Sequence, residues 1–256
     1  MMSPVVVWRM GRWGGSVLTV LGLAVGAAGQ ATPDVSAATA YSRGVQLADQ
    51  GKWQEAVEWL NRAVAAAPED AQYQKALGVA YGKLGDQAAA VEPLSRACQL
   101  DPKLPDACYY WGQALIALSR FEEALRALEL APASVSPGRL ATAQALALDG
   151  LGRESAAEAR FRAALKSTDY PAESRRRFGI FLYRRGRTAE AAVILEEAAR
   201  FNPQSAEIAL EQGRVYLQLN RLDDAAEALQ RAIKLDPTLS TAPMLFDRVM
   251  RRRQRP

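Results

Sequence analysis

The chain has 256 residues, 49% of them hydrophobic and 23% charged, and its 32 Lys and Arg against 28 Asp and Glu give a net charge of +4. It has no histidine and only two cysteines, so it lacks the commonest general base and the commonest neutral metal ligand, and two thiolates alone do not complete a structural zinc site. No phosphate-binding loop, nucleophile elbow or metalloprotease helix is present either. The sequence therefore predicts that the protein is not an enzyme and has no catalytic residue, cofactor or metal.

Residues 1–31 have the pattern of a signal peptide. Arg9 and Arg12 form a positive start, and the mostly apolar stretch from Val17 to Ala28 is shorter than the roughly 20 residues that span a bilayer. Cleavage after the small residues that follow would leave residues 32–36 as a short linker. An uncleaved membrane anchor is the alternative. Both interpretations export the rest of the chain, either free in a bacterial periplasm or anchored in the inner membrane and facing the periplasm.

From Ala37 to Pro237 one pattern returns about every 34 residues. Its marker is a residue that tolerates left-handed backbone, found at Gly51, Gly85, Ser119, Gly152, Gly186 and Asn220. After each marker come an alanine, a large apolar residue and a second alanine, always at the same spacing. The second alanine is Ala131 in the third unit and Ala164 in the fourth. This periodicity predicts two helices joined by a tight turn in each unit.

These residues resemble the tetratricopeptide repeat over residues 37–237. The resemblance includes the family's glycine in the first helix of a unit, at Gly44, Gly78, Gly112, Gly179 and Gly213. It implies an all-α fold, a right-handed α-solenoid of about six helix-turn-helix repeats with a C-terminal capping helix. The expected units are 37–70, 71–104, 105–137, 138–171, 172–205 and 206–239, followed by a capping helix at 240–250 and a basic tail at 251–256.

The two cysteines flank the predicted junction between the second and third units. Cys98 lies near the end of one helix and Cys108 near the start of the next. A disulfide between them is one hypothesis, because export leads to an oxidising compartment. The alternative is that both are small buried side chains of the core.

The third unit departs from the pattern. Pro132 falls where the second helix should continue, and the run from Pro132 to Gly138 predicts a loop in place of the last helical turn. The fourth unit has Gln144 and Ala145 where the family has Leu and Gly. A kinked or widened joint between these units is therefore expected. It would be either a hinge or binding notch, or tolerated drift in one repeat, which we favour.

The resemblance also implies where a partner binds. In the family the first helices of the units line a concave groove, and the matching positions here are Tyr41, Lys75, Tyr109, Tyr110, Gln113, Arg139, Arg176, Tyr183, Arg184 and Arg214. Tyrosine provides contact area and arginine binds carboxylates, although exposed arginines are also ordinary solubilising residues. The expected function is a non-enzymatic scaffold or adaptor that binds an extended peptide, acidic residues being suited to these arginines. The alternative is a structural subunit of a secretion, pilus or outer-membrane machine.

Arginines are concentrated late in the chain. Six lie in the fifth unit, namely Arg175, Arg176, Arg177, Arg184, Arg185 and Arg187, and five lie near the C-terminus, namely Arg248, Arg251, Arg252, Arg253 and Arg255. Such clusters suit anionic lipid or an acidic partner, and export argues against nucleic acid. A solvated tail is the simplest interpretation. The sequence does not determine whether the chain forms oligomers.

Overall fold

The structure is a computed structural model, and it describes residues 36–254. The predicted signal peptide at 1–31, nearly all of the predicted linker and the last two residues of the predicted tail lie outside the described residues. The export and anchor hypotheses therefore stay predictions. Among the helices of residues 36–254, none combines the length and the apolar character needed to cross a bilayer.

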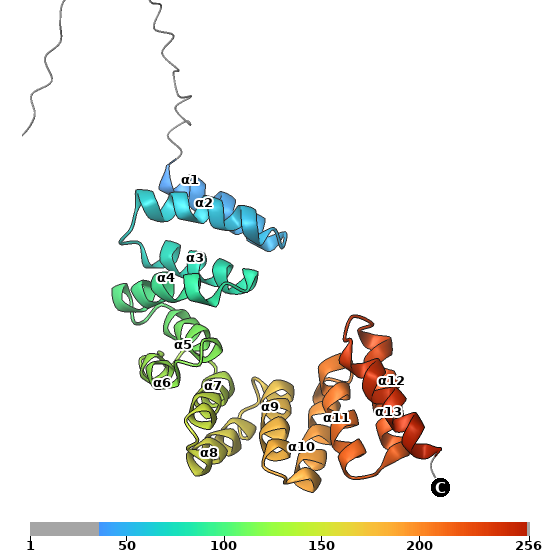
Figure 1. The fold of residues 1–256 in the computed structure, drawn as a ribbon. Coiled ribbons are helices and arrows are strands. Elements are labelled where there is room, and N and C mark those ends of the chain that lie inside the picture. Colours follow the sequence, from blue (N-terminus) through green and yellow to red (C-terminus); the bar gives the residue numbers. More distant parts are fainter. Residues whose placement is uncertain (1–35, 255–256) are drawn as a thin grey trace, which may run out of the picture. The chain divides into compact units, whose positions relative to one another are not determined.

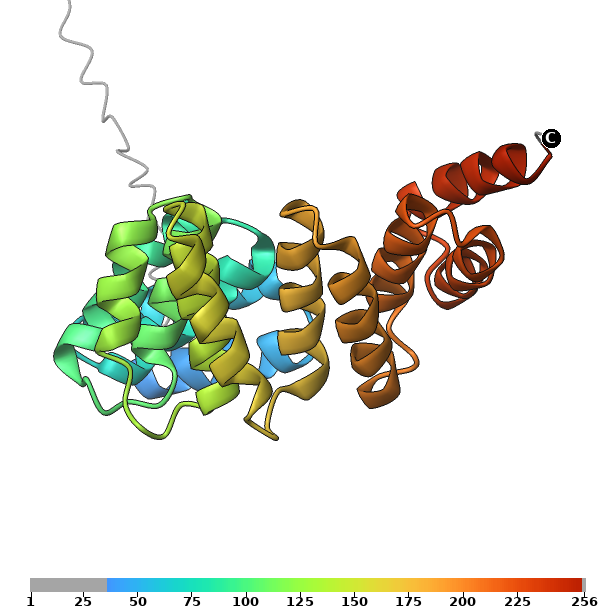
Figure 2. The ribbon, with the colours of Figure 1, turned by 90° about the horizontal axis from the view of Figure 1, so that it is seen from below.

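Residues 36–254 form thirteen α-helices and no strand, which confirms the predicted all-α fold. The first twelve helices pair into six helix-turn-helix hairpins that follow one another in chain order (Figures 1 and 2). The hairpins are α1 (Ala37–Asp49) with α2 (Trp53–Ala66), α3 (Ala71–Leu84) with α4 (Gln87–Leu100), α5 (Ala107–Ala117) with α6 (Phe121–Glu129), α7 (Pro137–Gly150) with α8 (Glu154–Leu165), α9 (Pro171–Arg184) with α10 (Thr188–Phe201), and α11 (Ala206–Gln218) with α12 (Leu222–Leu235). The last helix is α13 (Thr241–Arg253).

Every hairpin turns at the marker residue, and the predicted left-handed backbone is confirmed. The six markers have φ values from 58° to 88°. In the first hairpin the next residue, Lys52, donates its N–H to the Leu47 carbonyl, and the other five turns repeat this bond. The bond satisfies a carbonyl that the end of the helix leaves free. At Ser119 and Asn220, which carry a Cβ, the left-handed conformation costs about 1 kcal/mol.

A small residue in the first helix lets the second helix of the hairpin approach closely. A Cβ added at Gly213 would lie 2.4 Å from Leu229 Cγ, and the equivalent glycines of four other hairpins meet their leucines in the same way. In the fourth hairpin Ala145 takes the place of the glycine and Phe161 that of the leucine, and both are fully buried. Phe161 also stacks on Phe178 of the next hairpin, with ring centroids 5.4 Å apart.

The contacts between hairpins define an inner and an outer side of the stack. The first helices of neighbouring hairpins contact one another, from α1 with α3 to α9 with α11. Within residues 36–254 the second helices of neighbouring hairpins make no such contact, and the backbones of hairpins that are not neighbours lie apart. The first helices therefore form the inner layer of a curved solenoid, as expected for a repeat array.

The third hairpin has boundaries other than those predicted. α6 ends at Glu129, so Ala131, expected on a packed helical face, lies in the following loop. The predicted loop ends earlier than expected, because Pro137 and Gly138 already belong to the first turn of α7. Proline is tolerated there because the first N–H groups of a helix have no partner within it. The widened joint between the third and fourth hairpins stays a prediction.

α13 covers the sixth hairpin and is the predicted capping helix. It buries Ala242 and Val249 against α11 and α12. The helix continues beyond the predicted end at residue 250, so Arg252 and Arg253 lie in its last turn and not in a tail. Arg252 Nη1 donates to the Leu217 carbonyl at 3.2 Å, and Arg253 pairs with an aspartate of α12. These two arginines attach the cap to the sixth hairpin.

Candidate functional site

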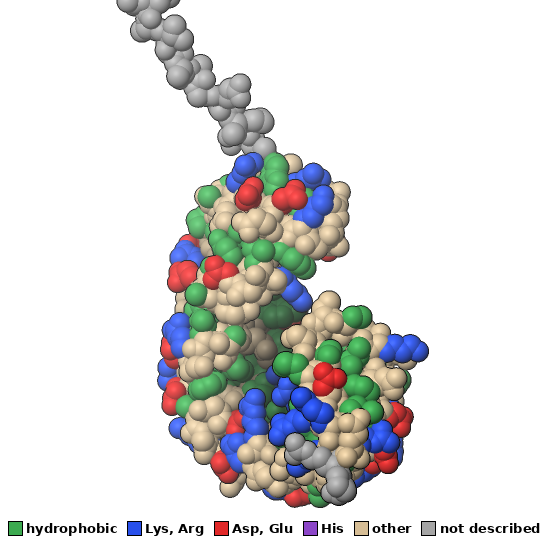
Figure 3. All heavy atoms as spheres, turned by 45° about the vertical axis from the view of Figure 1, so that its right-hand side comes forward, with side chains coloured by type: hydrophobic (Ala, Val, Ile, Leu, Met, Phe, Trp, Pro, Cys, Tyr) green, Lys and Arg blue, Asp and Glu red, His purple; other side chains and the backbone are tan. Residues whose placement is uncertain are grey.

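Two adjoining cavities open on the inner side of the first four hairpins. The first has a volume of about 280 Å³, and Lys75 of α3 and Asp106, just before α5, are among its lining residues. The second has a volume of about 450 Å³ and lies between α3, α5 and α7. Val79 and Tyr110 line both cavities, so the two cavities are adjacent, and together we call them the tyrosine groove. Figure 3 shows a hollowed face of the molecule in which hydrophobic and basic side chains gather.

Four of the predicted residues meet in the second cavity. Tyr109 and Tyr110 project from α5, and Arg139 of α7 lies over their rings, 4.4 and 5.8 Å from the two centroids. Gln113 Nε2 donates to Tyr109 Oη at 3.1 Å. Tyr109 is only 5% exposed, and burial raises the pKa of its hydroxyl, so this ring supports the cavity wall. Tyr110 is the more exposed of the two and is the better contact for a ligand.

The loop between α4 and α5 borders the first cavity through Asp106. A disulfide joins Cys98 of α4 to Cys108 of α5, with Cα atoms 4.9 Å apart, and both side chains are also buried. Within this closed loop, Asp106 Oδ1 accepts from Arg139 Nη1 at 3.4 Å. Lys75 Nζ donates to the carbonyl of residue 105 at 3.5 Å. The disulfide therefore holds a segment that contacts charged side chains of the tyrosine groove.

Three further predicted residues surround a carboxylate between α9 and α11, and we call them the arginine cluster: Arg176, Arg184 and Arg214. Burial raises the pKa of Glu211 against the attraction of all three. Arg214 Nε lies 3.8 Å from Glu211 Oε2, and Arg176 pairs with Glu173 at 2.5 Å. The cluster thus carries more positive than negative charge, but part of it is neutralised within the protein.

The other arginines of the fifth unit do not form the open basic patch that the sequence suggested. Arg175 pairs with Glu197, Arg177 with Glu173, Arg185 with Asp149, and Arg187 with Glu158 and Glu190, at distances from 2.5 to 3.0 Å. These carboxylates come from the fifth hairpin itself and from the fourth. The sequence showed the arginines but gave no sign of these pairs, so it overstated the charge available to a partner.

The two remaining predicted residues lie apart from these groups. Tyr41 stacks on Tyr73, with centroids 4.6 Å apart, and Tyr183 packs partly buried against the core. Sequence analysis missed Val79 and Tyr170, which line the second cavity. Val79 directly follows the glycine of α3, so its register could have identified it. Tyr170 lies in the loop before α9 and carries no helical periodicity.

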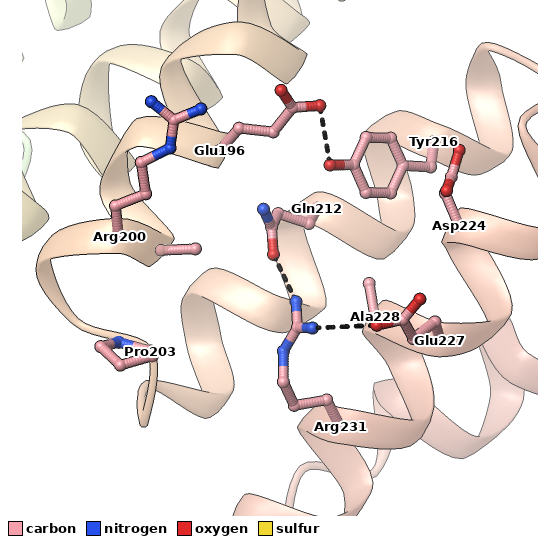
Figure 4. A pocket seen from close by; sticks show the side chains of 10 residues that line it. Glu196, Arg200, Pro203, Gln212, Tyr216, Asp224, Glu227, Ala228 and Arg231 are labelled. Atoms are coloured by element: carbon pink, nitrogen blue, oxygen red, sulfur yellow. Dashed lines mark hydrogen bonds and ion pairs between the residues drawn. The ribbon is translucent and has the colours of Figure 1, made fainter.

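A different cavity, of about 420 Å³, lies on the outer side between α10, α11 and α12 (Figure 4). Gln212, 4% exposed, forms its floor. Its Nε2 donates to the Leu195 carbonyl at 3.3 Å, and its Oε1 accepts from Arg231 Nη2 at 2.7 Å. Tyr216 Oη donates to Glu196 at 2.9 Å, and burial together with this carboxylate raises the pKa of Tyr216 to about 12.

The same place in the second unit holds an equivalent cavity of about 400 Å³, between α2, α3 and α4. Tyr81 corresponds to Tyr216, and Asn61 Nδ2 donates to its hydroxyl at 3.2 Å. Leu77 stands where the sixth unit has Gln212. Neither outer cavity was predicted from the sequence.

Comparison with protein families gives three matches. Two models, each described as a tetratricopeptide repeat, match residues 142–206 and 182–242. A third, described as anaphase-promoting complex, cyclosome, subunit 3, matches residues 49–131. The matched ranges lie within the six hairpins and α13.

Among curated proteins, the chain is similar to cellulose synthase operon protein C of Escherichia coli (strain K12), with 41% identity over 63 residues. That match covers 25% of this chain and only 5% of the other protein. Among solved structures, a tetratricopeptide repeat protein from Parabacteroides merdae has a TM-score of 0.71 at 18% identity, covering 86% of both chains. PilW, described as a widely conserved type IV pilus biogenesis factor, has a TM-score of 0.69 at 15% identity, covering 84% of this chain and 98% of its own. At these identities the structural likeness establishes a shared fold alone.

Proposed function

Because this chain is a tetratricopeptide-repeat protein, we propose that it is a non-enzymatic interaction scaffold whose tyrosine groove binds an extended segment of a partner protein. The observation that carries the proposal is that two cavities lie side by side on the inner layer and share wall residues. Val79 and Tyr110 line both cavities, so one segment crossing the inner side can place side chains in each. Concave, mostly apolar surfaces with a few polar groups are typical of binding sites.

Acidic residues in the partner would find the arginine cluster farther along the same inner layer. Arg184 is exposed and lies on α9, two hairpins after the helix that carries Tyr110. Long-range attraction to this excess positive charge would speed association with an acidic segment and would weaken as salt rises. Partial neutralisation by Glu173 and Glu211 limits the effect.

We also propose that the protein acts outside the cytoplasm. The signal-peptide pattern of residues 1–31 supports export, and so does the disulfide between Cys98 and Cys108, because such bonds persist mainly in oxidising compartments. Association with the membrane would then depend on whether the N-terminal segment is retained. A free basic tail contributes less than expected, because Arg252 and Arg253 are held against the sixth hairpin.

The second candidate function is that of a structural subunit in an envelope machine such as a secretion, pilus or outer-membrane assembly. The fold shared with the pilus biogenesis factor PilW favours it. The two candidates differ in fractionation. A scaffold binds its partner reversibly and separates from the membrane, whereas a subunit stays with the membrane complex after washing.

The test is crosslinking in the cell of origin followed by mass spectrometry, with a Tyr110→Ala, Lys75→Glu variant compared with the natural chain. Tyr110 is preferable to Tyr109, because truncating a nearly buried ring would also destabilise the wall of the cavity. The control is Phe201→Ala, which removes an exposed aromatic ring from α10. Partners lost only from the groove variant would support the proposal, and an unchanged set of partners would contradict it.

A further inference from the structure

Asp106 has an unusual backbone conformation for the residue that precedes a helix. Its φ is 65°, and its side chain makes no capping hydrogen bond to α5. Asp70, which precedes α3, behaves differently, with φ of −83° and an Oδ1 that accepts from the N–H groups of Gln72 and Tyr73. A capping bond of that kind usually stabilises the start of a helix. α5 does without it, so the carboxylate of Asp106 is available for another partner.

That partner is Arg139. The two side chains form an ion pair at 3.4 Å, with 31% of Asp106 and 27% of Arg139 exposed. The guanidinium also lies over Tyr109, 4.4 Å from the ring centroid. The one arginine that lines the second cavity is therefore charge-compensated on one side and stacked on an aromatic ring on the other.

Apart from Lys83, the other residues that line the second cavity are apolar or neutral. Val79, Leu94 and Ala114 contribute aliphatic surface, and Tyr110 and Tyr170 contribute aromatic rings. Its other charged side chain, Lys83, is exposed and therefore hydrated. A carboxylate entering the cavity would lose its own hydration and gain only an arginine that already has a partner. An apolar side chain entering the cavity would lose no such favourable hydration.

We propose that Asp106 determines the specificity of the tyrosine groove: by compensating Arg139, it makes the second cavity select an aromatic or large aliphatic side chain of the partner segment over an acidic one. The inference rests on the proposed function, which it makes specific for one side chain of the ligand. Asp106 acts through Arg139 and is a positioning residue.

The disulfide explains how Asp106 keeps this position. Cys98 and Cys108 close the loop at both ends, and inside it Leu104 is buried and Asp101 accepts from the Lys103 N–H at 2.9 Å. The loop is thus fixed by a covalent bond, a buried apolar residue and a local hydrogen bond. A residue other than glycine keeps a left-handed backbone only where the surrounding structure fixes its conformation, and this loop does so for Asp106.

The test is selection from a phage-displayed library of random peptides on the full chain and on its Asp106→Asn variant. Asparagine tolerates the left-handed conformation and removes the charge, so the loop should keep its backbone. We expect the natural chain to enrich peptides with an aromatic or large aliphatic anchor. The variant should shift the ratio of acidic to apolar anchors by about tenfold, the effect of one hydrogen bond between charged groups.

Two controls distinguish this effect from a general disturbance of the loop. Asp101→Asn removes a charge from the same loop without touching Arg139 and should select the same peptides as the natural chain. Asp106→Asn combined with Arg139→Gln should restore the apolar preference, because no uncompensated guanidinium remains.

Three results would overturn the inference. If the natural chain already enriches acidic anchors, or if the Asp106→Asn variant selects the same anchors as the natural chain, Asp106 does not set the specificity, while the groove remains a binding site. If no peptide is enriched by any of these proteins over a Tyr110→Ala, Lys75→Glu variant, the proposed function fails and this inference fails with it.

Discussion

The outer cavity of the second unit and that of the sixth occupy the same place in the repeat but have different floors. Both place a tyrosine hydroxyl, from Tyr81 or Tyr216, in a hydrogen bond to the preceding hairpin. The floor is Leu77 in one and Gln212 in the other, and the amide of Gln212 has a partner at both ends. A polar residue is thus tolerated at a buried repeat position when its hydrogen bonds are completed within the neighbouring hairpins.

The two ends of the array also differ in what ties a hairpin to the next one. A disulfide joins the second hairpin to the third. The fifth hairpin is held instead by ion pairs to its neighbours, such as Arg185 with Asp149 and Arg187 with Glu158. One repeat pattern is therefore compatible with a covalent connection at one junction and an ionic one at another.

Exchanging the residue types at the floors of the two outer cavities should change the free energy of unfolding more than any other variant considered. Leu77→Gln replaces a buried leucine by an amide, losing apolar packing, and should lower the free energy of unfolding by about 3 kcal/mol. Gln212→Leu should cost less than about 1 kcal/mol, because the Leu195 carbonyl keeps its partner within α10 and Arg231 remains near Glu227. Urea unfolding measures both. If both variants lost the same free energy of unfolding, the hydrogen-bond partners at the two positions would not explain why one floor is polar and the other apolar.

Removing the disulfide should have the next largest effect and should be local. Cys98→Ala with Cys108→Ala opens a loop of ten residues in sequence separation and should cost about 2 to 3 kcal/mol. Because hairpins contact only their neighbours, hydrogen exchange should accelerate in α4 and α5 and stay unchanged in α11 and α12. If hydrogen exchange accelerated equally in all helices, the expectation that the loss of the disulfide stays local would be wrong.

Adding a Cβ where the two helices of a hairpin approach closely should be equally destabilising in the second and the sixth hairpin. Gly78→Ala and Gly213→Ala each place a Cβ 2.4 Å from a leucine Cγ, and each should destabilise the chain by about 2 kcal/mol. Thermal unfolding of the two variants provides the measurement. A clear difference between them would mean that the ends also differ in how far their leucines can move.

The smallest effect concerns Tyr216 at alkaline pH. Its pKa is raised from 10.0 to about 12 by burial and by Glu196, so the unfolded chain loses the proton first and stability falls as pH rises between these values. Between about pH 9 and pH 11 this fall should be about 1 kcal/mol, and Tyr216→Phe should lack it. Denaturant unfolding at the two pH values tests this. An identical fall in the variant would assign it to other groups.

Features set by local backbone geometry could be predicted from the sequence. The six turn residues, Ser119 and Asn220 included, adopt the left-handed conformation that their residue types and spacing indicated. The capping helix was predicted too, although its end was placed too early. These features depend on residues a few positions apart, which one sequence displays directly.

Features set by partners far along the chain could not be predicted. Asp106 has a left-handed backbone and pairs with Arg139, 33 residues away, and its neighbours in the sequence indicate neither feature. The arginines of the fifth unit were recognised by type, but their carboxylates lie 22 to 36 residues away in cases such as Arg175 and Arg185. Tyr170 reaches the second cavity from a loop without periodicity. The composition of the groove was therefore partly predictable, and its charge was not.

The disulfide has a mechanical consequence for a chain that is pulled from both ends. In an array whose hairpins touch only their neighbours, tension can detach one hairpin after another. The residues between Cys98 and Cys108, roughly 30 Å of extended chain, cannot be drawn out while the bond is intact. A stretched molecule would therefore lengthen on either side of this junction, and the connection between α4 and α5 would carry the load as a short covalent link.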